Sequence, residues 1–117
     1  MEELGCVTPP AQLRALLLID TAGRLNVTAL ARALGASPSA TSKLGSRLEA
    51  AGLVARETAA ANRREVLLVI TESGQRLASW VRTQRRAAMT RALAQLSPEG
   101  REVLTRGLTE LAQHLPG

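Results

Sequence analysis

Apolar residues recur every three or four positions along most of this chain, and this spacing predicts helices rather than strands. The first apolar stripe consists of Leu13, Leu16, Leu17 and Ile19. Thr8-Pro9-Pro10 stands before it as a capping residue followed by proline, and Gly23 stands after it, where a helix commonly ends. The pattern therefore predicts one helix here, followed by a short strand at Leu25.

A second helix is predicted between Asn26, which can cap it, and Gly35, which can end it. Leu30 and Leu34 within it are four residues apart and share one face. Ser37-Pro38 begins another helix by the same rule of cap followed by proline, so only a tight turn separates the two. Two helices joined by so short a turn, with glycine in it, are typical of a helix-turn-helix.

The helix that begins at Pro38 extends to about Ala51, before Gly52, and has two unlike faces. The face predicted to enter the core consists of Thr41, Leu44, Leu48 and Ala51. The opposite face consists of Ser39, Ser42, Lys43 and Ser46. On an isolated helix such a polar face usually only meets solvent. Because this helix follows a tight helical turn, we interpret the hydroxyls and the lysine as a surface that approaches base edges in the major groove of DNA.

Two strands are predicted after this helix, over residues 53–57 and 66–70. Residues 58–65 between them include Arg63 and Arg64, and they are predicted to form the basic loop of a β-hairpin. Such a hairpin beside a recognition helix is a wing, and an arginine on it can enter the minor groove. Residues 37–64 hold five cations and two anions, a net +3, so more than half of the chain's excess charge of +5 lies on this predicted face.

The last third of the chain predicts two more helices. Thr71 can cap a long one that extends to about Leu96, and Ser97-Pro98 begins the final one. The apolar positions of the long helix are Leu77, Trp80, Val81, Ala88 and Leu93. Those of the final helix are Leu104, Leu108, Leu111 and Leu115, with a spacing of the heptad type. We expect this last row to contact a second copy of the chain, and packing back on the same chain is the alternative.

A chain of 117 residues has room for one domain. The sequence predicts a fold that is mainly α with a small β-hairpin. In this interpretation residues 8–71 form a winged helix-turn-helix lobe, and residues 72–117 form a helical lobe for dimerisation.

The charge balance points to a polyanionic partner. The chain has 15 Lys and Arg residues against 10 Asp and Glu residues, a net charge of +5. Fourteen of these cations are arginine, which suits phosphate and guanine edges but is also typical of high-GC genomes. The chain has no Phe or Tyr and one Trp, which disfavours a surface that stacks single-stranded bases. Double-stranded DNA is therefore the expected partner.

Little in the sequence suggests catalysis, and we expect neither a cofactor nor a metal. His114 is the only histidine and Asp20 the only aspartate, so a hydrolase triad or a metal site has few residues to use. Cys6 is the only cysteine, which excludes an internal disulfide and suits a cytoplasmic protein. No apolar run approaches the length of a membrane span, so no membrane partner is expected.

The helix-turn-helix and the wing resemble those of the MarR family of bacterial transcriptional regulators. The matching segments are residues 27–35, 37–43 and 48–54, and the resemblance extends over about residues 8–115. The wing pattern of that family is Asp-x-Arg, five residues, then Leu-Thr. Here Asn62-x-Arg64 is followed by five residues and then by Ile70-Thr71. An amide thus replaces the acid that orients the arginine in the family, although its oxygen can still accept a hydrogen bond.

The resemblance implies roles for individual residues. Ser39, Ser42 and Lys43 would contact bases in the major groove. Ser37 and Arg47 would contact phosphate, and Arg64 would enter the minor groove. The full set of predicted DNA-binding residues is Ser37, Ser39, Ser42, Lys43, Ser46, Arg47, Asn62, Arg63 and Arg64.

The resemblance also implies an effector, because family members often bind small aromatic or phenolic acids beside the dimerisation lobe. Residues placed to contact one are Arg14, Trp80 and Arg82. Members usually begin with a helix that helps form the dimer and walls this pocket, whereas only seven residues precede Thr8. We therefore expect an altered dimer and an open or absent pocket. Cys6 lies near where some relatives sense oxidants, but Glu2 and Glu3 have the wrong charge to activate a thiol.

Two functional hypotheses follow. The first is a homodimeric transcriptional regulator, more specifically a repressor, whose two recognition helices contact an inverted repeat about one helical turn apart. The alternative is a winged-helix protein-interaction module that pairs with another protein through its final helix, without specific DNA binding.

Overall fold

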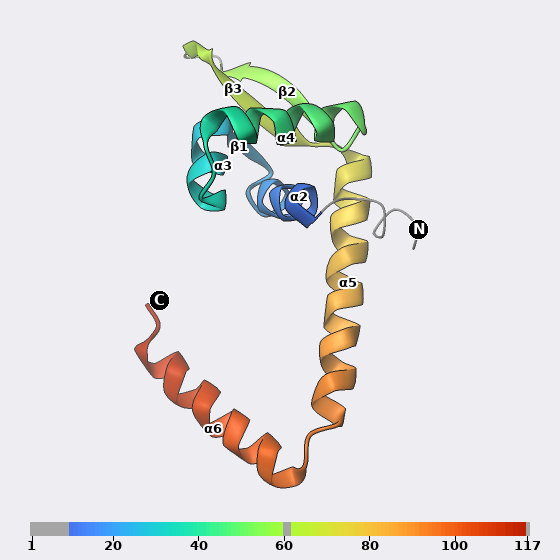
Figure 1. The fold of residues 1–117 in the computed structure, drawn as a ribbon, viewed down its shortest axis with the longest axis vertical. Coiled ribbons are helices and arrows are strands. Elements are labelled where there is room, and N and C mark those ends of the chain that lie inside the picture. The colour runs from blue at the N-terminus through green and yellow to red at the C-terminus, as the bar shows by residue number, and fades with distance from the viewer. Residues whose placement is uncertain (1–9, 60–61, 117) are drawn as a thin grey trace. The chain divides into compact units, whose positions relative to one another are not determined.

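The computed structural model describes residues 10–59 and 62–116, without the side chains of residues 59–64. Its elements are α2 (Pro10–Ala22), β1 (Arg24–Asn26), α3 (Val27–Leu34), α4 (Pro38–Ala50), β2 (Val54–Ala59), β3 (Asn62–Ile70), α5 (Glu72–Ala94) and α6 (Pro98–His114) (Figure 1). The prediction of a mainly helical fold with a small β-hairpin is confirmed, and β1 makes the hairpin part of a three-stranded sheet. Among the described residues, each helix is either too short or too polar to span a lipid bilayer.

Side-chain caps fix the starts of three helices. The Asn26 carboxamide oxygen accepts from the Ala29 N–H at 2.6 Å, Ser37 Oγ from the Ala40 N–H at 3.1 Å, and Ser97 Oγ from the Gly100 N–H at 3.0 Å. Each cap satisfies one of the backbone donors that a helix start leaves without a partner. These local rules were sufficient to predict where the helices begin.

The turn between α3 and α4 depends on Gly35. Its φ of 67° lies in the left-handed region, which glycine adopts without steric cost. The Gly35 N–H donates to Arg32 O, and the Ala36 N–H donates to Ala31 O, so the free carbonyls at the end of α3 are used. The predicted helix-turn-helix geometry is confirmed.

The sheet has three antiparallel strands in the order β1-β3-β2. Leu25 of β1 pairs with Leu68 of β3, which confirms the strand predicted at Leu25. On the other side Arg56 of β2 also pairs with Leu68. β3 is therefore the central strand. Its Leu68 is fully buried and packs against α4 at Gly45.

The prediction of a loop over residues 58–65 was wrong. β2 continues to Ala59 and β3 already begins at Asn62, so the backbone of Asn62, Arg63 and Arg64 is strand. The pairs Thr58↔Val66 and Ala59↔Asn62 extend the ladder, with a register shift between Thr58 and Ala59. Pairing satisfies backbone donors and acceptors along the hairpin, and this gain outweighs the weak strand preference of Asn and Arg.

One core joins α2, α3, α4, the sheet and the first part of α5. Its buried apolar members are Ala15, Leu16, Ile19, Leu30, Leu48, Val54, Leu68, Leu77 and Val81. The predicted core face of α4 was partly wrong, because Ala51 is exposed, Leu44 is only half-buried, and Gly45 is buried instead. A Cβ on Gly45 would lie 3.2 Å from Leu68 Cδ1, so the helix approaches the sheet at its glycine.

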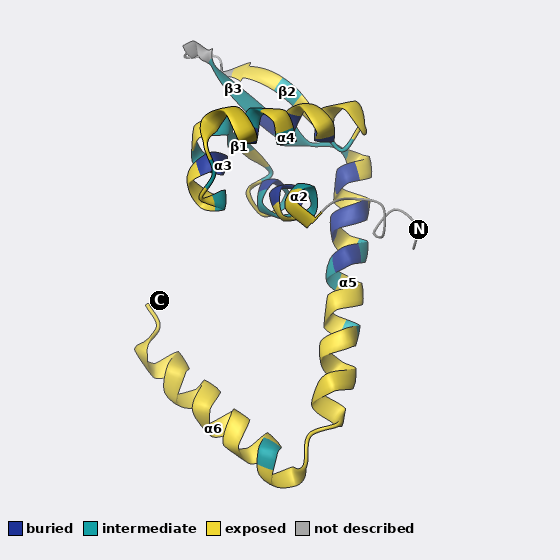
Figure 2. Ribbon diagram, in the orientation of Figure 1, coloured by how far each residue is buried: buried dark blue, intermediate teal, exposed yellow. Residues whose placement is uncertain are grey.

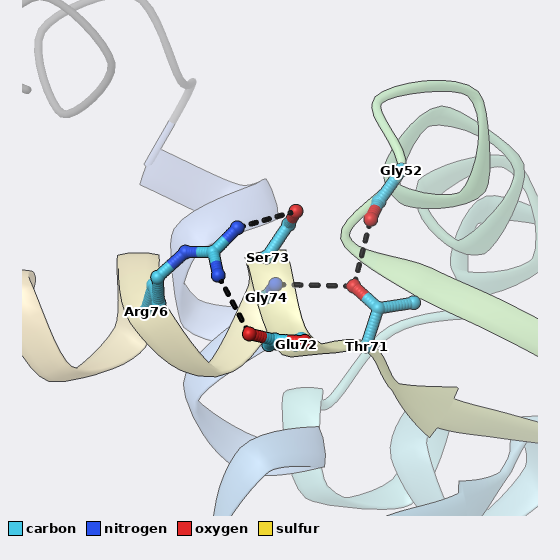
Figure 3. Close-up of polar contacts among 6 residues, drawn as sticks. All are labelled: Gly52, Thr71, Glu72, Ser73, Gly74 and Arg76. Carbon is cyan, nitrogen blue, oxygen red and sulfur yellow. Dashed lines mark hydrogen bonds and ion pairs between the residues drawn. The ribbon is translucent and has the colours of Figure 1, made fainter.

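A polar junction connects the end of α4 to the start of α5 (Figure 3). The Thr71 hydroxyl donates to Gly52 O at 2.7 Å and accepts from the Gly74 N–H at 3.1 Å, which confirms the predicted cap. The Thr71 N–H donates to Leu53 O at 3.1 Å. A Cβ on Gly74 would lie 2.1 Å from that same oxygen, so only glycine allows this approach.

The chain divides into two compact units, with the boundary between Arg82 and Thr83. The start of α5 belongs with the first unit, because Leu77, Ala78 and Val81 are buried in its core. In the second unit no residue of α6 is buried (Figure 2). Ala88 and Leu93, predicted as part of the apolar face of α5, are exposed.

Candidate nucleic-acid interface

α4 presents one face to the core and the opposite face to solvent. Thr41, Gly45 and Leu48 form the buried face. The predicted DNA-binding residues on the helix all lie on its accessible surface: Ser39, Lys43, Ser46 and Arg47 are exposed, and Ser42 is half-buried. Lys43 and Arg47 are four residues apart, so two cations lie on neighbouring turns of this surface.

The hydroxyls on this helix are not all free. Ser37 Oγ already accepts the Ala40 N–H, so its cap role and the predicted phosphate contact share one oxygen. Ser46 Oγ accepts a hydrogen bond from Arg56 Nη2 at 2.8 Å. Ser37 therefore has only its hydroxyl hydrogen and its second lone pair left for DNA, and the same holds for Ser46.

Arg56 was not selected as a site residue from the sequence. In the structure it lies on β2 and contacts α4 at Ser42, Ser46 and Glu49. In the sequence it is one arginine among many, in a strand of mixed polarity. The only pattern that marks it is the net charge of residues 37–64, to which it contributes.

A hollow of about 400 Å³ opens beside the first half of α4. Its lining residues are Asn26, Val27, Thr28, Pro38, Ser39, Ser42, Arg56, Glu65 and Val66. Asn26 Nδ2 donates to Glu65 Oε1 at 2.7 Å across it, while the oxygen of the same amide caps α3. The start of α3, the start of α4 and the central strand therefore meet around one depression of mixed polarity.

The predicted wing contacts lie outside the described side chains. The backbone of Asn62, Arg63 and Arg64 lies in β3, but their side chains are not described. The Asn62–Arg64 pairing and the minor-groove role of Arg64 therefore stay predictions. Cys6 also lies outside the described residues.

The predicted effector residues have different surroundings. Arg82 forms an ion pair with Asp20, and its Nη2 donates to Leu17 O at 3.1 Å and to Thr21 Oγ1 at 3.0 Å. Trp80 is half-buried against the core, and Arg14 is exposed on α2. An acidic effector at Arg82 would have to compete with the chain's own carboxylate. The described residues include no group of His, Cys, Asp and Glu suited to a metal ion.

The predicted dimerisation row lies on α6, except for Leu115, which directly follows the helix in extended backbone. Leu104, Leu108, Leu111 and Leu115 are 39%, 55%, 53% and 59% exposed. Val103 beside them is 66% exposed. These side chains form an apolar surface that nothing covers within the described part of the second unit.

Comparisons with known proteins agree with this geometry. A sequence model of the MarR family matches residues 9–66. The chain is similar to the uncharacterized HTH-type transcriptional regulator YfiV of Bacillus subtilis (strain 168), with 33% identity over 89% of this chain and 65% of that protein. It is also similar to the HTH-type transcriptional repressor MdtR of the same organism, with 34% identity over 85% of this chain and 63% of that protein. The chain thus spans less than two-thirds of the length of either relative.

A solved structure is also similar, and this chain covers a larger share of it than of the two relatives. The structure of a MarR family protein from Bacillus stearothermophilus has 30% sequence identity to this chain and a TM-score of 0.76. The similarity covers 92% of this chain and 74% of that one. Sequence pattern, helix-turn-helix geometry and these similarities agree, and the chain belongs to the MarR family.

Proposed function

We propose that this chain is a transcriptional regulator that binds double-stranded DNA in a sequence-specific manner. The observation that supports it most is the outward face of α4. That helix is fixed on its sheet by Gly45 and Leu48, and it exposes Ser39, Lys43 and Ser46 to solvent. The two serine hydroxyls are short enough to let a helix approach base edges and can donate or accept there, and the lysine adds a charged donor.

Charge around the helix supports the same proposal. Arg47 is exposed one turn after Lys43, and residues 37–64 have a net charge of +3. Cations at the rim of a recognition helix neutralise phosphates and release counterions, so binding should weaken as salt rises. Arg64 on the wing is proposed to add a minor-groove contact.

The proposed active form is a homodimer that contacts an inverted repeat. The exposed leucines of α6 support it, because a row of large apolar side chains gains free energy when it leaves water. Two copies related by a two-fold axis would place two α4 helices on half-sites about one helical turn apart. The name of MdtR, a repressor, supports repression as the outcome of operator binding.

In vitro selection from random duplex DNA, at one fixed salt concentration near physiological, tests the proposal. We expect enrichment of an inverted repeat by the wild-type chain, and no enrichment by a Lys43→Ala/Arg47→Ala variant that melts at the same temperature. Repression is then tested with a reporter whose promoter overlaps the selected repeat. Binding without any consensus would contradict sequence-specific regulation.

The exposed row of α6 also suits a second candidate function, in which the chain pairs with a different protein. Analytical ultracentrifugation of the purified chain separates the two. A dimer that persists at micromolar concentration supports the regulator. A monomer that gains mass only with another protein supports the interaction module.

A further inference from the structure

Arg56 of β2 contacts two successive turns of α4, the proposed recognition helix. Arg56 Nη2 donates to Ser46 Oγ at 2.8 Å and to Ser42 O at 3.2 Å. Its Nε lies 3.1 Å from Glu49 Oε1. These partners stand at i, i+4 and i+7 on α4, so one guanidinium lies along the side of the helix and joins it to β2.

Gly45 makes this contact possible. A Cβ there would lie 3.2 Å from Leu68 Cδ1 and 3.5 Å from Arg56 Nη2. A Cβ at this position would thus be in tight contact with the Leu68 side chain and in ordinary contact with the guanidinium, and a larger side chain would crowd both. The side chain of Arg56 is 28% exposed, so its hydrogen bonds to α4 are partly shielded from water.

The contact changes what the Ser46 hydroxyl can do. Hydroxyls on helices commonly donate to the carbonyl four residues earlier. The described threonines that do so are Thr21, Thr41, Thr90, Thr105 and Thr109. For Ser46 that carbonyl belongs to Ser42, which receives Arg56 Nη2 instead. The same Nη2 occupies an acceptor site of Ser46 Oγ, so a Ser46 O–H turned toward Ser42 O would have to share that carbonyl with Nη2.

We propose that Arg56 is a positioning residue that determines specificity, because it fixes the Ser46 hydroxyl as a hydrogen-bond donor toward DNA. The inference rests on the proposed function. A fixed donor selects a base that presents an acceptor in the major groove, such as N7 or O6 of a purine or O4 of thymine. It disfavours cytosine, which presents its amino group there, because Arg56 leaves only one lone pair on Ser46 Oγ to accept it.

Much of the Arg56 guanidinium is turned to the protein rather than to a phosphate in this arrangement. Glu49 lies against Nε and balances its charge, and Nη2 is used by Ser42 and Ser46. In the proposed role the effect of Arg56 on DNA is exerted through Ser46, and the salt dependence of binding distinguishes this role from a phosphate contact by Nη1. This separates it from Arg47, whose exposed side chain is free to meet a phosphate.

A double-mutant cycle tests the proposal. Affinities of wild type, Ser46→Ala, Arg56→Met and the double variant are measured on the selected operator and on duplexes with single bases replaced by cytosine. We expect one position where cytosine lowers wild-type affinity by about 3–10-fold, the size of one net hydrogen bond. That preference should disappear in either single variant. The double variant should bind the operator no more weakly than the single variants do. Arg56→Lys is measured beside Arg56→Met in case the latter fails to fold. Lysine keeps the positive charge but lacks the planar guanidinium that donates to Ser42 and Ser46 together.

Two controls separate positioning from a general loss of fold or charge. Ser39→Ala removes a hydroxyl on the same face of α4. Its fold-loss of DNA affinity should be independent of that of Arg56→Met, so that the two losses multiply in the double variant. The salt dependence of binding should be unchanged in Arg56→Met, whereas the loss of a phosphate contact lowers the slope by about one. Independent effects of Ser46 and Arg56, or a lower slope, would overturn the inference. A wild-type chain that selects no duplex would instead overturn the proposed function itself.

Discussion

The first turn of α5 fits against the segment after α4 only because residue 74 is glycine. A Cβ there would lie 2.1 Å from Leu53 O and 2.6 Å from Ile70 Cδ1. The Ile70 side chain can rotate, but the Leu53 carbonyl is backbone and already accepts the Thr71 N–H at 3.1 Å. Gly74→Ala must therefore move α5 away from the core.

The magnitude follows from this geometry. A retreat of more than about 1 Å is needed to reach an ordinary contact, and so short a contact with backbone puts the cost at the upper end of overpacking, about 2–3 kcal/mol. Alanine returns up to about 1 kcal/mol through its better helix propensity. The net loss of about 1–2 kcal/mol in the free energy of unfolding should lower Tm by roughly 4–16 °C in a domain of this size.

Thermal unfolding followed by circular dichroism measures this loss, at one protein concentration because the proposed dimerisation would also stabilise the fold. Ser73→Ala is the matched control. It changes the neighbouring residue of the same turn, is exposed, and should alter stability by less than about 0.5 kcal/mol. A Gly74→Ala protein as stable as wild type would refute the close approach of α5 to Leu53.

Three further predictions concern the Thr71 cap, the Arg82–Asp20 ion pair and the proposed dimer. Thr71→Val removes both hydrogen bonds of the Thr71 hydroxyl and should lower the free energy of unfolding by about 1–2 kcal/mol in urea denaturation. Thr90→Val loses one exposed hydrogen bond and should change that free energy by less than about 0.5 kcal/mol. Arg82→Met leaves the Asp20 carboxylate without its cation and should cost about 1–2 kcal/mol, and an equal loss in exposed Arg85→Met would contradict this reasoning. Leu108→Glu should convert the dimer to a monomer in sedimentation without lowering helix content, and an intact dimer would exclude the α6 row as the interface.

Features that depend on a few neighbouring residues were predictable from the sequence. Asn26, Ser37, Thr71 and Ser97 cap their helices as predicted, because each cap joins a side chain to a backbone N–H three residues later. The outward face of α4 was predicted for a similar reason, since helical periodicity alone places Ser39, Ser42, Lys43 and Ser46 together. Such features do not depend on tertiary contacts.

Features that depend on distant residues were missed. Gly45 is buried on the core face of α4 because Leu68, far along the chain, lies beneath it. The hairpin is longer than predicted because strand pairing overrides the weak propensities of its residues. Arg56 joins α4 through partners ten and fourteen residues away, and only the folded sheet brings them together.

The central claim is that the outward face of α4 distinguishes one DNA sequence from another. The most direct test is the affinity of Lys43→Ala for the selected operator and for random duplex at one salt concentration, with Arg91→Ala, an exposed cation of the second unit, as control. We predict that Lys43→Ala loses about 1–3 kcal/mol on the operator and much less on random DNA, so that its preference falls, while Arg91→Ala keeps the preference. An unchanged ratio of operator to random affinity in Lys43→Ala, or an equal fall in Arg91→Ala, would contradict the account.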